Sequence, residues 1–460
     1  MSGQPASRRA LVVACNFPPD ASVGTMRTLR LVRHLHGQGW TVDALTIAPE
    51  GYRPGTVRDP ALVDRLPAGM TVLRAMPLRP FERLTAAVKR LMGGGAAPAA
   101  AATTATAAPS PSPAPPAPAP GWSLARLRRA LTAAMSLPDR EVSWLAPAAW
   151  AGWRQARRFR PDVIYSSGPP FSSHMVSLFI SRLTGVPWVA DFRDPWARAP
   201  WREDRFEFER QAWTIFERMV VRRADFAVFA SETNRDDFAR EYGAEAAARF
   251  MFIPNGCDPG DFDGLAAQQR QDGPFVLLHA GSLYGARNPA GLFRAVAAAI
   301  SGGTLDRSGF RLRFLGRVGL PGVDLPGIAR ELGLDGVVEF ISQVPRRTSL
   351  QEMMNASGLL IVQPVTTVAV PAKLYEYMAA GRPVLCLAEP GGETAVLVEK
   401  SGAGITVRAE DEAEIARGLG ALVELSRNGF RPAASDAYDG NVRAAELRTV
   451  LERASAGARP

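Results

Sequence analysis

The chain has 460 residues, which is long enough for two or three domains of ordinary size. Hydrophobic residues make up 47% of it and charged residues 22%, proportions typical of a globular protein and unlike those of a disordered chain. The formal net charge of +9 leaves nucleic acids, acidic membranes and anionic small molecules open as partners. The arginines are dispersed, however, and no zinc-finger, RRM or KH pattern accompanies them, so nucleic-acid binding is not predicted.

Membrane-spanning and metal-binding classes are also disfavoured. No apolar run reaches about eighteen residues, so no transmembrane helix is predicted. The short apolar run at 10–15 lacks the length of a signal sequence and favours a first β-strand, so we expect a cytoplasmic protein. Cys15, Cys257 and Cys386 lie far apart without any metal-binding spacing, and we predict that they are small buried side chains.

The first elements in the chain alternate between strand and helix. Residues 10–15 form an apolar run, 16–24 a loop rich in turn-forming residues, and 26–39 a segment with helical spacing of leucines. Residues 40–47 then alternate as a strand. This βαβ pattern predicts a parallel sheet that is covered by helices.

Residues 93–120 differ in kind, because they consist mainly of Ala, Pro, Ser and Thr and cannot bury a core. We predict a disordered insertion there. Two basic amphipathic segments flank it, at 81–92 and 122–135. Packing of their apolar faces onto the domain is the favoured interpretation, and attachment to a membrane surface is the alternative.

Strands and helices alternate again from Pro161 to about 262, and in the same manner over 274–400. Two doubly wound α/β domains of similar size, facing a cleft, are therefore predicted. The segment 434–454 has the periodicity of one more helix.

Four loops that follow strands carry unusual chemistry, and ligands of open α/β sheets bind on such loops. The first runs from Phe17 to Gly24, where a glycine before a helix lets a phosphate approach backbone N–H groups. The second begins at Gly281 and contains Arg287, whose guanidinium suits a diphosphate. Neither loop is a Walker A motif or a GxGxxG fingerprint.

The third loop leads into the segment 371–393, where Lys373 and Glu376 are three residues apart and share a helical face. The lysine suits phosphate charge and the glutamate suits the hydroxyls of a ribose. The alternative for Glu376 is an ordinary ion pair with Lys373 or Arg382. The fourth loop, WVADFRDPWARAPW, places carboxylates between tryptophans, which suits sugar binding, although an internal Arg–Asp pair is equally compatible.

At these residues the chain closely resembles glycosyltransferase family 4, in the branch associated with cell-surface and exopolysaccharide synthesis. The resemblance is carried, in order, by PDVIYSSGPPFSSH, VPWVADFRDPW, IPNGCD, GSLYGARNP, GVVEFISQV and VPAKLYEYMAAGRPVL. It covers about 8–60 and 138–430. The resemblance implies a GT-B fold with two Rossmann-like domains, retention of anomeric configuration, and catalysis with a nucleoside-diphosphate sugar but without a metal or other cofactor.

The resemblance assigns donor-binding roles to particular positions. Gly24 matches a glycine that approaches the donor diphosphate, and Arg287 matches a phosphate-binding lysine that follows the strand-end glycine, here Gly281. Lys373 is placed beside them as a second phosphate ligand. Ser282 stands where many members have a second phosphate-binding arginine, so that charge is missing here.

The same comparison assigns the remaining positions. Glu376 matches the second of two glutamates and would hold the ribose hydroxyls, whereas the first is replaced by Val368. Arg193 stands where many members have a histidine near the reacting centre, followed by Asp194 in the same register. With Asp191, these two are the predicted catalytic residues.

The domains expected from this resemblance are an acceptor-side domain over 1–262, a nucleotide-sugar-binding domain over 270–432, and a C-terminal helix in 433–460 that packs back on the first domain. The expected partners are a nucleotide sugar, a glycan or lipid-linked acceptor, and the inner face of an anionic membrane in peripheral contact. Two alternatives stay open: a nucleotide-sugar epimerase of the same architecture, and a binding protein that has lost catalysis.

Overall fold

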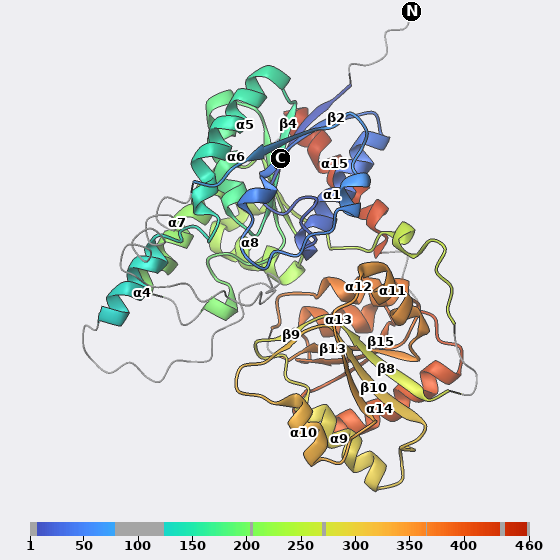
Figure 1. Cartoon of the computed structure of the whole chain (residues 1–460). Helices are drawn as coiled ribbons and strands as arrows, with labels where there is room; N and C mark the ends of the chain where they lie inside the picture. The colour runs from blue at the N-terminus through green and yellow to red at the C-terminus, as the bar shows by residue number, and fades with distance from the viewer. Residues whose placement is uncertain are drawn as a thin grey trace, which may run out of the picture. The chain divides into compact units, whose positions relative to one another are not determined.

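The computed structural model describes residues 7–78, 124–202, 206–268, 273–364, 366–432 and 438–457. They form two compact units, shown in Figure 1. The first unit runs to Ile253 and resumes at Ala444, and the second runs from Pro254 to Arg443. The sequence placed the same divisions at 262 and 433. The predicted insertion at 93–120 and the amphipathic segment at 81–92 lie outside the described residues.

The first unit contains a seven-stranded sheet in the order β3-β2-β1-β4-β5-β6-β7, and every pairing is parallel. The strands are β1 (Arg9–Ala14), β2 (Thr41–Ile47), β3 (Thr71–Ala75), β4 (Val163–Gly168), β5 (Trp188–Phe192), β6 (Phe226–Phe229) and β7 (Phe250–Phe252). Successive side chains of β1 point to opposite faces, and both faces are buried. This explains why the strand reads as a continuous apolar run.

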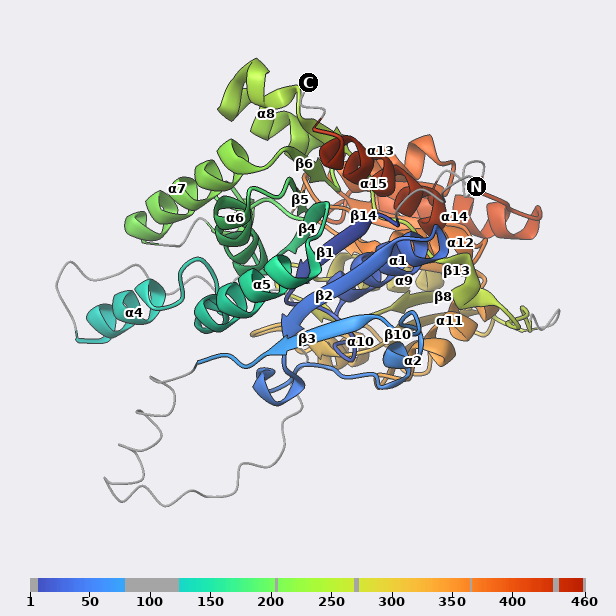
Figure 2. The ribbon, with the colours of Figure 1, turned by 90° about the horizontal axis from the view of Figure 1, so that it is seen from above.

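Helices cover both faces of the first sheet. The helices α5 to α8 pack on one face, and α1 and α15 pack on the other. Their bounds are α1 (Val23–Gly37), α5 (Leu145–Phe159), α6 (Ser172–Thr184), α7 (Glu207–Arg223), α8 (Glu232–Ala247) and α15 (Gly440–Ser455). The shorter helices are η1 (Pro49–Gly51), α2 (Ala61–Asp64), α4 (Leu124–Ala134), η2 (Val142–Trp144) and η3 (Pro200–Arg202). Figure 2 shows α5 and α6 lying along the sheet.

Helix α4 belongs to the second amphipathic segment that the sequence singled out. Packing of its apolar face was expected, but Leu131 is more than half exposed and Met135, directly after the helix, is also exposed. At these two residues the expectation of packing is wrong, because no element of the described part of the chain covers them.

The second unit has a six-stranded parallel sheet in the order β12-β10-β8-β13-β14-β15. The strands are β8 (Phe275–Ala280), β10 (Phe310–Leu315), β12 (Val338–Ile341), β13 (Gly358–Gln363), β14 (Val384–Ala388) and β15 (Gly404–Val407), and β9 (Leu283–Tyr284) pairs separately with β11 (Val318–Gly319). Helices α9, α10 and α14 cover one face and α11, α12 and α13 the other. Their bounds, with the short helix that precedes the sheet, are η4 (Pro259–Phe262), α9 (Ala290–Ser301), α10 (Leu325–Glu331), α11 (Arg346–Asn355), α12 (Ala372–Ala379), α13 (Glu393–Lys400) and α14 (Glu412–Arg427).

The chain passes from one unit to the other twice, and the two connecting segments are hydrogen-bonded to each other. Cys257 N–H donates to the carbonyl of Tyr438 at 3.1 Å, and Gly440 N–H donates to the carbonyl of Cys257 at 2.6 Å. An added Cβ at Gly256 would lie only 2.5 Å from the Tyr438 carbonyl oxygen. The glycine therefore permits the close approach of the two segments.

Candidate functional site

Two cationic side chains lie at the carboxyl end of β8 in the second unit. Lys373, on the first turn of α12, reaches over Gly281, the residue that follows β8. Gly281 has a φ of +133°, so glycine is favoured there, and an added Cβ would displace Lys373, whose Nζ would lie 2.5 Å away. The hydroxyl of Tyr377, one turn further along α12, accepts the N–H of Ala280 at 2.8 Å and fixes this helix to the strand end.

The immediate partner of Lys373 is a histidine that the sequence analysis did not single out. His279 Nε2 lies 3.2 Å from Lys373 Nζ, and His279 Nδ1 lies 2.9 Å from the carbonyl oxygen of Leu360. Because a carbonyl only accepts, Nδ1 carries the hydrogen and Nε2 accepts from the lysine. Burial, followed by the charge of Lys373, lowers the pKa of His279 well below its ordinary value, so the ring is neutral.

Arg287 is the second cation and is held in place by two neighbours. Its Nε donates to Gln363 Oε1 at the end of β13 over 2.9 Å, and its guanidinium carbon lies 4.2 Å from the ring centroid of Tyr284. Burial and the nearby charge of Arg287 lower the pKa of Lys373 to about 7. Within the described residues, neither Lys373 nor Arg287 forms an ion pair with a carboxylate. Two neighbouring cations that form no direct ion pair within the described residues make a site that suits an anion.

Glu376 faces a different cation from either one that the sequence suggested. Arg346 Nη1 donates to Glu376 Oε1 at 2.6 Å, and Arg346 Nη2 donates to Asp261 Oδ2 at 2.8 Å. Arg382 instead donates to the carbonyl of Met354. The ion pair with Arg346 orients the Glu376 carboxylate through one oxygen.

Ser282 and Val368 lie close to this site in the chain but add no charge to it. Ser282 is half-buried directly after Gly281. Val368 lies in the loop before α12, which is tied to the start of α13: Glu393 N–H donates to the carbonyl of Thr367 at 2.9 Å. The hydroxyl of Thr394 donates to the carbonyl of Ala369 at 3.0 Å. This loop is therefore held by its backbone.

In the first unit, the structure brings Gly24 and Arg193 together. Gly24 lies in the first turn of α1, and a Cβ placed on it would lie 2.1 Å from Arg193 Nη1. Arg193 N–H donates to the carbonyl of Gly168 at 2.9 Å, and its guanidinium donates to the carbonyl of Pro169. The glycine leaves room for the guanidinium of Arg193 at the start of α1. Asp194 follows, partly buried and engaged with neighbours.

Asp191 has a different environment from its two predicted companions. It is fully buried, and its carboxylate accepts from Arg27 Nε and Nη2, each at 2.9 Å. The hydroxyls of Tyr165 and Ser167 donate to it at 2.7 and 3.1 Å. Burial alone would raise the pKa of Asp191, but the charge of Arg27 lowers it. The structure therefore shows Asp191 as an interior counter-ion to Arg27.

Three residues of the candidate site were missed in the sequence: His279, Gln363 and Arg346. His279 and Gln363 lie at the carboxyl ends of β8 and β13, and Arg346 begins α11. Strands β8 and β13 are neighbours in the sheet although about eighty residues separate them in the sequence. The only sequence signal available was the polar residue at the end of an apolar strand, as in FVLLHAG and LLIVQP.

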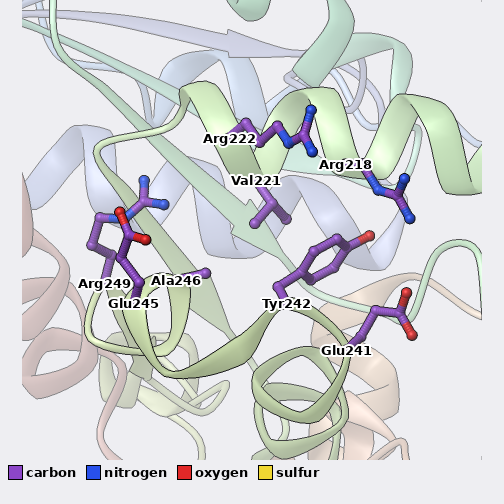
Figure 3. Close-up of a pocket in the computed structure, with 8 residues that line it drawn as sticks. All are labelled: Arg218, Val221, Arg222, Glu241, Tyr242, Glu245, Ala246 and Arg249. Carbon is purple, nitrogen blue, oxygen red and sulfur yellow. The ribbon is translucent and has the colours of Figure 1, made fainter.

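A separate groove of about 410 Å³ lies between α7 and α8 of the first unit, beside the start of β7 (Figure 3). Its charged lining mixes cations with carboxylates, namely Arg218, Arg222, Arg249, Glu241 and Glu245. Ligands of such sheets bind at the carboxyl ends of the strands, and this groove lies at the amino end of β7. Its position and its balanced charge separate it from the candidate site.

No cluster of three or more His, Cys, Asp or Glu side chains has a metal-binding arrangement in the described part of the chain. Nor does any helix within the described ranges have the length and apolar character needed to cross a bilayer.

Two family models match the chain. Glycosyltransferase Family 4 matches residues 102–261, and Glycosyl transferases group 1 matches 274–424, so the two together cover about two thirds of the sequence. Among curated proteins, no significant match is found.

Solved structures with the same fold span nearly the whole chain. HepE of Anabaena in complex with UDP has a TM-score of 0.60 at 14% identity, covering 97% of this chain and 99% of that one. WaaG, described as a glycosyltransferase involved in lipopolysaccharide biosynthesis, has a TM-score of 0.57 at 15% identity, covering 96% and 99%. A putative UDP-N-acetylglucosamine 2-epimerase from Listeria monocytogenes has a lower TM-score of 0.53 at 11% identity, covering 97% and 96%.

These likenesses show the fold, and the family models show the class of enzyme. The predicted pair of Rossmann-like domains is confirmed. The chain is therefore a glycosyltransferase of the GT-B type, with a family 4 domain followed by a group 1 domain.

Proposed function

We propose that this glycosyltransferase transfers a sugar from a nucleoside-diphosphate donor to a glycan or lipid-linked acceptor during the synthesis of a cell-surface glycan or exopolysaccharide. The reaction retains the anomeric configuration and uses no bound metal or other cofactor. The enzyme works in the cytoplasm, in peripheral contact with the inner face of an anionic membrane.

The proposal rests mainly on two neighbouring cations, Lys373 and Arg287, at the carboxyl end of β8. Lys373 and Arg287 have no carboxylate partner within the described residues, and Gly281 leaves the approach to Lys373 open. Two phosphates of a nucleoside diphosphate would supply the missing negative charge. As the sugar leaves, charge grows on the distal phosphate, and fixed cations stabilise that charge in the transition state.

The other predicted residues take complementary roles in this proposal. Glu376, oriented by Arg346 through one oxygen, accepts the ribose hydroxyls with its other oxygen. Ser282 contributes a neutral contact beside Gly281, where a second cation is absent. Gly24, Arg193 and Asp194 act near the reacting centre.

Two complexes of a similar protein favour a uracil nucleotide as the first donor to test. HepE has been solved with UDP and with UDP-glucose. The link of WaaG to lipopolysaccharide supports an acceptor in a surface glycan.

A panel of nucleotide sugars, including UDP-glucose, tests the function directly. Each is incubated with the protein and with lipid-linked and glycan acceptors, and the products are resolved by mass spectrometry. Acceptor-dependent release of nucleoside diphosphate with a new glycosidic product supports transfer. An epimerised donor would instead establish an epimerase, and donor binding without turnover would establish a binding protein that has lost catalysis.

A further inference from the structure

The helix layer formed by α5, α6 and α7 presents large apolar side chains outward. Trp150 on α5 is 59% exposed, Phe179 and Leu183 on α6 are 44% and 56% exposed, and Ile215 on α7 is 57% exposed. Helix α6 packs between the other two, and Figures 1 and 2 both show the three helices as neighbours in the first unit. Four such residues on three adjacent helices form one surface, unlike apolar residues scattered singly over a protein.

Exposed arginines accompany the apolar residues on each of the three helices. On α5 the exposed Arg154 and Arg157 come one and two turns after Trp150, and on α7 Arg218 and Arg222 follow Ile215 in the same way. Arg182 lies beside Leu183 on α6. Because the helices connect parallel strands of one sheet, they run in the same direction. Their arginines therefore gather toward one end of the layer.

This layer contains almost no exposed negative charge. The sequences of α5 and α6 have no acidic residue. On α7, Glu209 and Glu217 are buried, and the exposed Glu207 pairs with Arg210 at the other end of the helix. Among the described residues near this layer, acidic side chains reappear across the groove of Figure 3, where Glu241 and Glu245 of α8 face α7. The basic and apolar surface therefore ends at α7.

An aromatic pair lies at its α5 edge. The rings of Trp150 and Trp153 are 5.0 Å apart, and the guanidinium carbon of Arg157 lies 5.3 Å from the Trp153 ring centroid. Tryptophans with an adjacent arginine are typical of the boundary between lipid headgroups and acyl chains, where one part of the side chain is apolar and the other is hydrated.

We propose that the outward face of α5, α6 and α7, called here the basic–apolar face, is the surface by which this protein docks on an anionic lipid bilayer. Trp150, Phe179, Leu183 and Ile215 enter the headgroup region, and the exposed arginines on the same helices pair with lipid phosphates. This inference deepens the membrane contact proposed above and rests on it. It places the contact on the folded helix layer of the first unit.

The charge pattern favours a lipid bilayer over a second copy of this chain or a nucleic acid as the partner of this face. A second copy docked through the same face would bring arginines against arginines about a two-fold axis, with few carboxylates to offset them. A nucleic acid would engage the arginines but would gain little from Phe179, Leu183 and Ile215. An anionic bilayer complements both the charge and the apolar side chains.

Co-sedimentation of the full chain with phosphatidylcholine vesicles, with and without phosphatidylglycerol, tests the proposal. We expect binding only to the anionic vesicles. The variant Arg154→Gln/Arg182→Gln/Arg218→Gln should bind about a hundredfold more weakly, since each basic residue near such a surface contributes about 1 kcal/mol. The matched control is Arg417→Gln/Arg427→Gln/Arg431→Gln, with the same change in net charge on exposed arginines of the second unit, and it should bind nearly as the parent does.

A second variant separates the contribution of the apolar side chains to vesicle binding from that of the arginines. Phe179→Ser/Leu183→Ser should weaken vesicle binding and make the remaining binding more sensitive to salt, while Val442→Ser on α15 should not. The proposal is overturned if the parent protein does not bind vesicles, or if the two triple arginine variants lose vesicle binding equally. It is also overturned if Phe179→Ser/Leu183→Ser binds vesicles as the parent does. A parent dimer that the face variants dissociate, or displacement of the parent from vesicles by duplex DNA, would overturn it too.

Calorimetry with UDP-glucose distinguishes a failure of the membrane-docking proposal from a failure of the proposed glycosyltransferase function. The face variants should bind the nucleotide as the parent does, because the cation pair lies in the other unit.

Discussion

Lys373 Nζ lies 3.2 Å from His279 Nε2, so a neutral ring and not a carboxylate orients the buried lysine of the donor site. Burial and the charge of Arg287 lower the pKa of this lysine to about 7, from an ordinary value of 10.5. Below about pH 7 the empty site therefore carries the full charge of Lys373, and above it that charge is progressively lost.

Donor binding should consequently take up a proton on the alkaline side of neutrality. A bound diphosphate stabilises the ammonium form and raises the pKa of Lys373, so affinity should be flat below about pH 7 and fall by up to about tenfold per pH unit above it. Calorimetry with UDP-glucose at about pH 8, in buffers of different ionisation enthalpy, measures the uptake, because the diphosphate of this probe does not titrate there. The variant Lys373→Arg keeps its charge and should take up no proton. The idea fails if the parent protein takes up none either.

Removal of the Arg287 guanidinium should weaken nucleotide binding. We expect Arg287→Ala to lose about 1.5–3 kcal/mol of binding free energy for UDP, the range for a hydrogen bond to a charged group. Arg294→Ala is a suitable control, because Arg294 pairs with Glu412 on the exposed side of α9, and its loss should change affinity by less than about 0.5 kcal/mol. Unchanged affinity in Arg287→Ala would remove this arginine from the donor site.

Glu376→Gln tests the proposed contact with the ribose. The change keeps the shape but removes the charge, so donor affinity should fall by about 1–3 kcal/mol. The fold should be little affected, since Arg346 keeps its ion pair with Asp261. A 2′-deoxy nucleotide already lacks one hydroxyl, and the loss measured with it should be clearly smaller. Equal losses for the ribo and deoxy nucleotides would show that Glu376 does not hold the ribose.

Asp191→Asn should lower the free energy of unfolding. Removing one charge from the fully buried pair with Arg27 leaves the guanidinium uncompensated, which costs about 3–5 kcal/mol of unfolding free energy. Because the pKa of Asp191 is lowered in the folded state, its stabilising effect is present above the unfolded pKa near 4 and is lost as the pH falls further. Urea denaturation at neutral and acidic pH measures both effects. A variant as stable as the parent but without activity would return Asp191 to the reacting centre.

The βα alternation of both units could be predicted from sequence because strands buried on both faces form continuous apolar runs, as in β1 and β13. The places of Gly281, Arg287 and Lys373 at one sheet edge followed from the same alternation, since carboxyl ends of parallel strands share an edge. The neighbours Gly24 and Arg193 follow from the order of β1, β4 and β5 in the first sheet.

Individual polar partners could not be predicted in this way. Asp191 lies next to Arg193 and Asp194 in sequence, yet strand alternation turns it inward to meet Arg27 of α1. For Glu376 the alternative was an ion pair within its own segment, but α11 brings Arg346 to it. Both outcomes depend on which helix packs beside which strand, and a single sequence does not specify that.

Helix α15 supplies the last part of the chain to the core of the first unit. Leu447, Val450 and Leu451 are buried together with Ala10 and Val12 of β1. During synthesis, everything up to Ile253 leaves the ribosome with this part of its core uncovered, and 254–443 must be made before α15 exists. The unit that is translated first is thus the last to finish folding. A chain that stops before Ala444 leaves a bare apolar surface for chaperones and proteases, however complete its second unit is.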